Sequence, residues 1–175
     1  MEIKTEIPDG IDAEYDGEVL EVTDGDQEVS KKLNHALVNV EVDGDEIVFT
    51  TETDRKNVTS IAKSFRSHAE NMIEGLEEEY VYRMKGVYAH FPMNIKKEDG
   101  EVVIENFMGE RNPRRVEIME GVDVEVDGED LTITGPDKEN VSQTAARIEQ
   151  MSSKGSRDPR SFQDGVYILE EESDE

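Results

Sequence analysis

Two stretches of the chain alternate apolar and polar residues on both sides of an Asp-Gly pair. Residues 38–49 place valine at every second position, then Asp43 and Gly44, and then isoleucine and phenylalanine in alternation. Residues 122–133 repeat this pattern around a second Asp-Gly pair. A period of two buries one face of a strand, and glycine supplies the positive φ that a tight turn needs. Both stretches are therefore predicted to be β-hairpins.

A different period follows each hairpin. Apolar residues recur at helical spacing from Val58 to Leu76 and again from Val141 to Met151, which predicts one amphipathic helix after each hairpin. Asp54 and Asp137 precede these helices, and we expect both side chains to cap the free amides of the first turn. Further strands are expected over residues 19–22, 29–33, 102–107, 116–119 and parts of 77–95, including the 87–91 run.

The chain also repeats itself. Residues 40–47 align with residues 124–131 at an offset of 124 − 40 = 84, and Asp54 aligns with Asp137 at 137 − 54 = 83. By the same alignment the Lys31–Lys32 pair falls on the pair at 114 and 115. We therefore predict a tandem duplication with domains 1–82 and 83–175. Each domain is expected to be a mostly antiparallel β-sheet packed by one helix, which places the chain in the α+β class.

The net charge of the chain is strongly negative and needs its own explanation. The chain has 44 Asp and Glu against 19 Lys and Arg, a net charge of −25. The apolar periodicity argues against a disordered acidic chain, which leaves a scaffold for basic partners or adaptation to a salt-rich cytoplasm. We favour the second, because the acids are spread over turns, strands and helix faces, and because at ~1 M salt the Debye length falls to about 3 Å.

Several functional classes are disfavoured. No stretch is long and apolar enough for a membrane span, no signal peptide is visible, and there is no cysteine; a cytoplasmic location is the default. Residues 12–17 resemble the start of a calcium loop, but Thr23 stands where that loop requires Glu, so a turn is favoured. His35, His68 and His90 lack ligand spacing. No enzyme activity, metal or cofactor is expected.

Two cationic islands stand out from this acidic background. The first is residues 105–115, with Arg111, Arg114 and Arg115 within five positions, and the second is residues 154–167. Guanidinium groups match phosphate geometry, and cations beside aromatic and amide side chains suit RNA. Two simpler interpretations stay open: local neutralisation of acid in the first island, and an ordinary helix-to-strand connection in the second.

Three further segments are distinctive in combination: Tyr-Ala-His-Phe-Pro at 88–92, the run from Val103 to Arg115, and Phe-Gln-Asp-Gly-Val-Tyr at 162–167. Together they resemble the archaeal form of a family of large-subunit ribosomal proteins, ribosomal protein L-six. The tandem duplication extends the likeness over almost the whole chain, and the excess of acid is similar to that of a member from a salt-loving archaeon. The acidic tail at 170–175 departs from the many relatives with basic residues there.

The resemblance implies a function. Family members bind large-subunit (23S) ribosomal RNA, chiefly through the second domain, near the lateral stalk base and the factor-binding region, and so support translation in the cytoplasmic large subunit. The implied partners are this RNA and neighbouring ribosomal proteins, with no DNA, membrane or homo-oligomer; the first domain would face proteins or solvent. The implied RNA-binding residues are Asn106, Gly109, Arg111, Asn112, Arg114, Arg115, Lys154, Arg157, Arg160 and Gly165.

The alternative is an acidic, non-enzymatic protein-interaction module that binds a basic partner through its sheet faces. The two functions differ in the residues that matter, arginines for RNA and acidic faces for a basic partner. The second domain carries 12 Lys and Arg against 22 Asp and Glu, so overall attraction cannot hold it on RNA. RNA binding would have to come from localised arginines and shape fit.

Overall fold

The structure, a computed structural model, describes residues 1–153, 155, 160 and 163–169. The backbone forms two compact units, Met1–Glu79 and Tyr80–Glu175, each with its own buried apolar cluster. The division expected after Tyr82 falls inside strand β7 (Tyr80–Val87). All of β7 belongs to the second unit, because Tyr80 and Tyr82 pair with Gly135 and Ile133 there.

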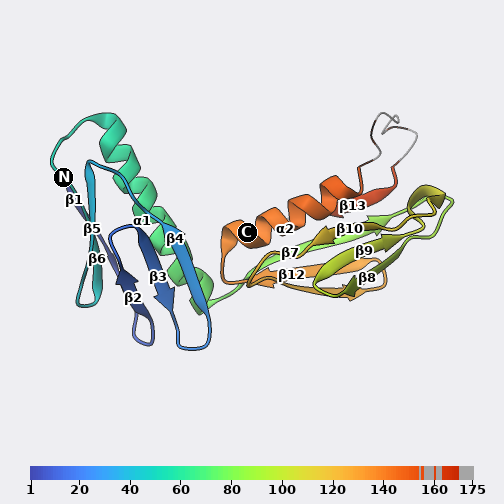
Figure 1. Cartoon of the computed structure of the whole chain (residues 1–175), viewed down its shortest axis with the longest axis horizontal. Helices are drawn as coiled ribbons and strands as arrows, with labels where there is room; N and C mark the ends of the chain where they lie inside the picture. The colour runs from blue at the N-terminus through green and yellow to red at the C-terminus, as the bar shows by residue number, and fades with distance from the viewer. Residues whose placement is uncertain (154, 156–159, 161–162, 170–175) are drawn as a thin grey trace, which may run out of the picture. The chain divides into compact units, whose positions relative to one another are not determined.

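The first unit contains two three-stranded antiparallel sheets (Figure 1), with strand orders β1-β6-β5 and β2-β3-β4. Helix α1 (Lys56–Glu77) packs on both sheets and buries the apolar face that its periodicity predicted. The strands are β1 (Glu2–Glu6), β2 (Asp12–Tyr15), β3 (Val19–Thr23), β4 (Glu28–Lys32), β5 (Val38–Asp43) and β6 (Glu46–Thr51).

The second unit repeats the plan with two antiparallel sheets, ordered β10-β9-β8 and β11-β12-β7-β13. Helix α2 (Lys138–Met151) contacts β7, β12 and β13 of one sheet and β10 of the other, as Figure 1 shows. The remaining elements are β8 (Asn94–Glu98), β9 (Glu101–Glu105), the short 3-10 helix η1 (Phe107–Gly109), β10 (Arg114–Glu117), β11 (Asp123–Asp127), β12 (Asp130–Gly135) and β13 (Gly165–Ile168).

These elements confirm the predicted α+β duplication. Both hairpins are present: Asp43 pairs with Glu46 around Gly44 at φ +63°, and Asp127 pairs with Asp130 around Gly128 at φ +62°. The strands of each unit are divided between two sheets, where the alternation had suggested one. Alternation identifies the buried face of each strand, but it does not identify which strands pair.

The two predicted helix caps have different outcomes. The Asp137 carboxylate accepts hydrogen bonds from the backbone N–H groups of Glu139 at 3.0 Å and Asn140 at 3.3 Å, as predicted. The prediction for Asp54 is wrong: Arg55 occupies the N-cap of α1 and makes no side-chain cap. Helix α1 begins two residues after Asp54, so this carboxylate lies outside capping range, 91 % exposed and 3.6 Å from the N-terminal amine.

The 88–91 run is another difference from prediction. Strand β7 ends at Val87, and Tyr88 and Phe91 are exposed in the connection to β8. The predicted strand at 102–107 ends at Glu105, since Asn106 adopts a left-handed backbone conformation and Phe107 begins η1. The second unit therefore has a loop between β7 and β8 and a tight turn directly after β9.

Candidate nucleic-acid interface

A tight turn at Asn106–Glu110 forms the centre of the first cationic island. Asn106, Met108 and Gly109 have φ values of +58°, +50° and +78°, a region that residues with a Cβ adopt at a cost of about 1–3 kcal/mol each. The surroundings stabilise this conformation. Phe107 is buried in the core, and the Asn106 side-chain amide donates to the Pro92 carbonyl at 3.1 Å. The turn is therefore a defined shape fixed to the 88–92 loop.

Besides its positive φ, Gly109 is favoured at this position for a second reason, the space that it leaves for a neighbouring ring. A Cβ built on it would lie 3.1–3.3 Å from three ring carbons of Phe91, closer than such atoms normally approach. The absence of a side chain at Gly109 lets the Phe91 ring rest on the turn, with 48 % of the residue left exposed. This contact is a structural reason for glycine at position 109.

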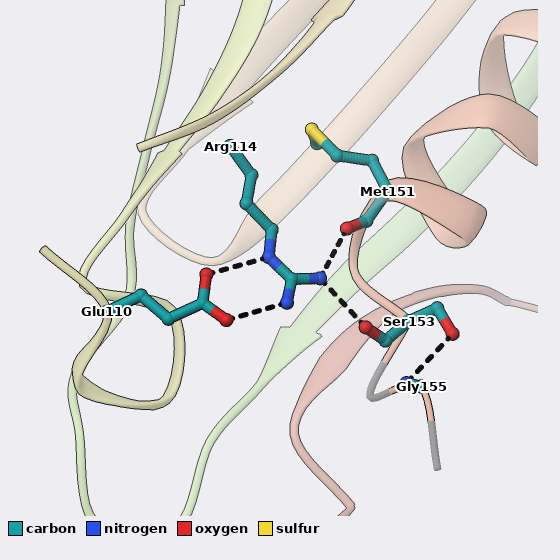
Figure 2. A network of polar contacts seen from close by, with 5 residues as sticks. All are labelled: Glu110, Arg114, Met151, Ser153 and Gly155. Carbon is teal, nitrogen blue, oxygen red and sulfur yellow. Dashed lines mark hydrogen bonds and ion pairs between the residues drawn. The ribbon is translucent and has the colours of Figure 1, made fainter. Parts of the chain in front are cut away.

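Arg114 is occupied within the protein, as Figure 2 shows. Its Nε and Nη2 donate to the two carboxylate oxygens of Glu110 at 2.9 and 2.7 Å. Its Nη1 donates to the backbone carbonyls of Met151 at 2.7 Å and Ser153 at 2.8 Å. The guanidinium carbon also lies 4.2 Å from the centre of the Phe107 ring. Four hydrogen bonds engage most of the five N–H donors of this guanidinium.

Arg115 has a different environment from its neighbour, because successive residues of a strand project to opposite faces. Its Nη1 lies 3.3 Å from an oxygen of Glu101, and the two side chains are 46 % and 36 % exposed. An exposed pair with a single contact contributes about 0–1 kcal/mol. A competing phosphate can therefore displace Glu101 at little cost.

Arg111 and Asn112 are both exposed. Within the part of the chain that the structure describes, neither side chain makes a hydrogen bond or an ion pair. They lie in the short connection between η1 and β10, where a guanidinium and an amide can reach an external ligand. Of the first island, Arg111, Asn112 and Arg115 are thus the side chains available at the surface.

Lys96 joins Arg115 on the outer face of the β8-β9-β10 sheet, since both residues are in register with Val103. Its Nζ lies 2.9 Å from Glu105. The pKa of the Glu105 carboxyl is lowered, chiefly by the hydrogen bond from Lys96, then by that from Asn94, with a smaller contribution from the charge of Arg115. Sequence inspection missed Lys96 because the strand register that places it beside Arg115 cannot be read from local pattern.

The second island is only partly described. Lys154, Arg157 and Phe162 lie outside the described residues. Arg160 is exposed and interacts with another part of the protein. Gly165 is buried at the start of β13, where a Cβ would lie 3.0 Å from the Tyr167 ring.

A hydrogen bond joins the residue after α2 to strand β13, on either side of most of the second island. The Ser152 hydroxyl, just after α2, accepts from the Val166 backbone N–H at 2.8 Å. Ser153, which follows it, supplies one of the carbonyls that Arg114 contacts. Ser153, the residue that precedes the second island, therefore contacts the Arg114 side chain of the first.

The stretch at 12–17, expected to be a turn, is strand β2 over Asp12–Tyr15 and a turn only from Asp16 onward. In that turn one oxygen of Asp16 accepts from the N–H groups of Glu18 at 2.9 Å and Val19 at 2.8 Å. Among the described residues, no group of three or more His, Asp or Glu side chains is placed to hold a metal ion. No helix in the described ranges is long and apolar enough to cross a membrane.

The structure places this chain among duplicated, two-domain α+β proteins, with exposed arginines beside a fixed turn in the second unit. Residues 91–165 match the family model described as Ribosomal protein L6. The chain is 46 % identical over 166 residues to large ribosomal subunit protein uL6 of Haloarcula marismortui, covering 95 % of this chain and 93 % of that protein. It is 41 % identical over 170 residues to uL6 of Natronomonas pharaonis, covering 97 % and 96 %.

A third relative, uL6 of Methanococcus vannielii, is 39 % identical over 165 residues, covering 94 % of this chain and 91 % of that protein. The chain therefore belongs to the ribosomal protein L6 family. This confirms the resemblance seen in the sequence, including its archaeal, halophilic character, because all three relatives are archaeal and two are haloarchaeal. It also confirms that the chain is a non-enzymatic protein.

Proposed function

We propose that this protein is a structural constituent of the large ribosomal subunit in the cytoplasm and binds large-subunit ribosomal RNA through its second unit. The relatives are named as large ribosomal subunit proteins and match over nearly the whole chain. The observation that carries RNA binding is the group of exposed cationic and amide side chains beside the fixed turn, Arg111, Asn112 and Arg115.

The electrostatics require binding to be local. The net charge of −25 repels a polyanion, and molar salt weakens the release of counterions as a driving force. Contacts must therefore come from guanidinium groups held in a defined geometry, where charge-assisted hydrogen bonds to phosphate are short and strong. The fixed turn supplies that geometry for Arg111, and β10 supplies it for Arg115.

The position within the subunit is part of the proposal. We place the second unit near the lateral stalk base and the factor-binding RNA, with Lys154, Arg157 and Arg160 of the second island as further contacts. The first unit would face neighbouring ribosomal proteins or solvent. These placements rest on the family resemblance, and the exposed cations of the second unit support the division between the two units.

The proposal is tested by measuring the affinity of the full chain for purified large-subunit RNA in molar potassium chloride. Reversing Arg111 and Arg115 to Glu should lower affinity by about 100-fold or more, since each charge-assisted contact contributes about 1.5–3 kcal/mol. The matched control reverses Lys31 and Lys32 in the first unit, an equal change in charge, and should lower affinity less than about threefold. Equal losses in the two variants, or no loss, would overturn the proposal.

A further inference from the structure

We infer that Arg114 is a positioning residue: it fastens the Asn106–Glu110 turn to the carboxyl end of α2 and so holds Arg111 and Asn112 toward phosphate, without contacting RNA itself. This inference rests on the proposed function of the same surface. It separates Arg114 from Arg115, although the two are adjacent in sequence.

The first argument is the chemistry of the acceptors. The last carbonyls of a helix lack partners within the helix and carry partial negative charge. Arg114 donates to the carbonyls of Met151, the last residue of α2, and of Ser153 just beyond it. A cation at this position satisfies backbone groups that would otherwise need another donor. Moving Arg114 to an RNA phosphate would leave these carbonyls without their hydrogen bonds.

The second argument is the position of the carboxylate. Glu110 follows the left-handed residues of the turn and receives two hydrogen bonds from Arg114. Arg111 and Asn112 lie between these two residues in the chain. The bidentate pair between Glu110 and Arg114, drawn in Figure 2, therefore closes the short segment that contains them. The same guanidinium lies over Phe107 within the turn. Both ends of the segment that presents Arg111 are therefore fixed by one side chain.

This arrangement predicts a change in RNA affinity opposite in direction to the change expected from charge alone. Removing an acid near bound RNA normally raises affinity. Glu101→Gln should do so or leave affinity unchanged, because it frees Arg115. Glu110→Gln removes an equal charge but weakens the bidentate pair. It should lower affinity for large-subunit RNA by about tenfold, the loss of roughly one contact. An increase in affinity for Glu110→Gln would overturn the inference.

Arg114→Lys gives a second, independent variant. Lysine keeps the charge, but it is a point donor without the planar fork that reaches a carboxylate and two carbonyls together. The inference predicts a loss of about tenfold for this variant as well, the size of one contact. If Arg114 contacted phosphate only through its charge, Arg114→Lys would keep wild-type affinity, and that result would also overturn the inference.

A double-mutant cycle separates positioning from general loss of structure. Arg111→Ala is measured in the wild-type and Glu110→Gln backgrounds, with circular dichroism and thermal unfolding as controls for the fold. If Arg114 acts through Arg111, the loss caused by Arg111→Ala should be clearly smaller in the Glu110→Gln background, because coupled residues are not additive. Additive losses would contradict the inference. Failure of the wild-type protein to bind this RNA would instead overturn the proposed function.

Discussion

Arg114 and Arg115 show how two identical neighbours acquire different roles. The cluster of arginines was visible in the sequence, whereas the ion pair between Glu110 and Arg114 was not predicted from it. The remaining partners of Arg114, the carbonyls of Met151 and Ser153, are 37 and 39 positions away. No local pattern indicates that contact, so only the fold shows that Arg114 is occupied while Arg115 is exposed.

Gly109 offers a test at the same scale. Gly109→Ala should lower both stability and affinity for large-subunit RNA, because a methyl group would press on the Phe91 ring and distort the turn. Gly121→Ala is the matched control: Gly121 also has a positive φ, at +74°, but nothing lies within 4 Å of its Cβ position. Both variants carry backbone strain of about 1 kcal/mol or more.

Thermal unfolding and RNA affinity measured in molar potassium chloride distinguish the two glycine variants. Both should unfold at a lower temperature than the wild type, and only Gly109→Ala should bind RNA more weakly. Equal RNA affinities for the two variants would show that the contact between Phe91 and the turn has no part in binding.

At the scale of elements, local periodicity predicted the two Asp-Gly hairpins and the helices, and it missed strands β1, β2 and β13. Strand β1 pairs with β6, and β13 pairs with β7, so their short sequences carry little pattern of their own. The same reason explains why two sheets in each unit could not be distinguished from one. The two hairpin turns at Asp-Gly pairs depend on local sequence, and they were predicted correctly.

The outer face of the β2-β3-β4 sheet places acids against one another. Glu14 lies directly opposite Glu21, and the charge of Glu28 is the main cause that raises the pKa of Glu21. A carboxyl whose pKa is raised in the folded state stabilises the protein below its unfolded pKa, and this contribution is lost as pH rises through the folded pKa. At neutral pH the contact is therefore repulsive, and salt screens it.

Replacing Glu28 with Gln should consequently raise the thermal midpoint in low salt and change it little in molar potassium chloride. It should also reduce the loss of stability as pH rises above the ordinary range for Glu. Glu125→Gln is the control, because this exposed acid on β11 faces Thr132 across the ladder. Thermal unfolding over a salt series measures both variants. An equal response of the two variants would mean that the repulsion is spread over the acids in general and is not concentrated between Glu21 and Glu28.

At the scale of the whole molecule, the duplication supplies one fold with two different surfaces. In both units the first cation of a pair is opposite a buried apolar residue, with Lys31 facing Leu20 and Arg114 facing Ile104. The second cation of each pair lies beside a Glu, Lys32 beside Glu18 and Arg115 beside Glu101, but lysine is a point charge where arginine presents a planar guanidinium fork. Fold class and family could be predicted from the sequence, whereas the different contacts of Arg114 and Arg115 could be seen only in the structure.

The most direct test of RNA binding by the second unit is chemical footprinting of purified large-subunit RNA in molar potassium chloride, with and without the full chain. We predict localised protection that disappears when Arg111 and Arg115 are reversed to Glu and persists when Lys31 and Lys32 are reversed. No protection by the folded wild-type protein, or protection that depends on Lys31 and Lys32 alone, would contradict RNA binding through the second unit.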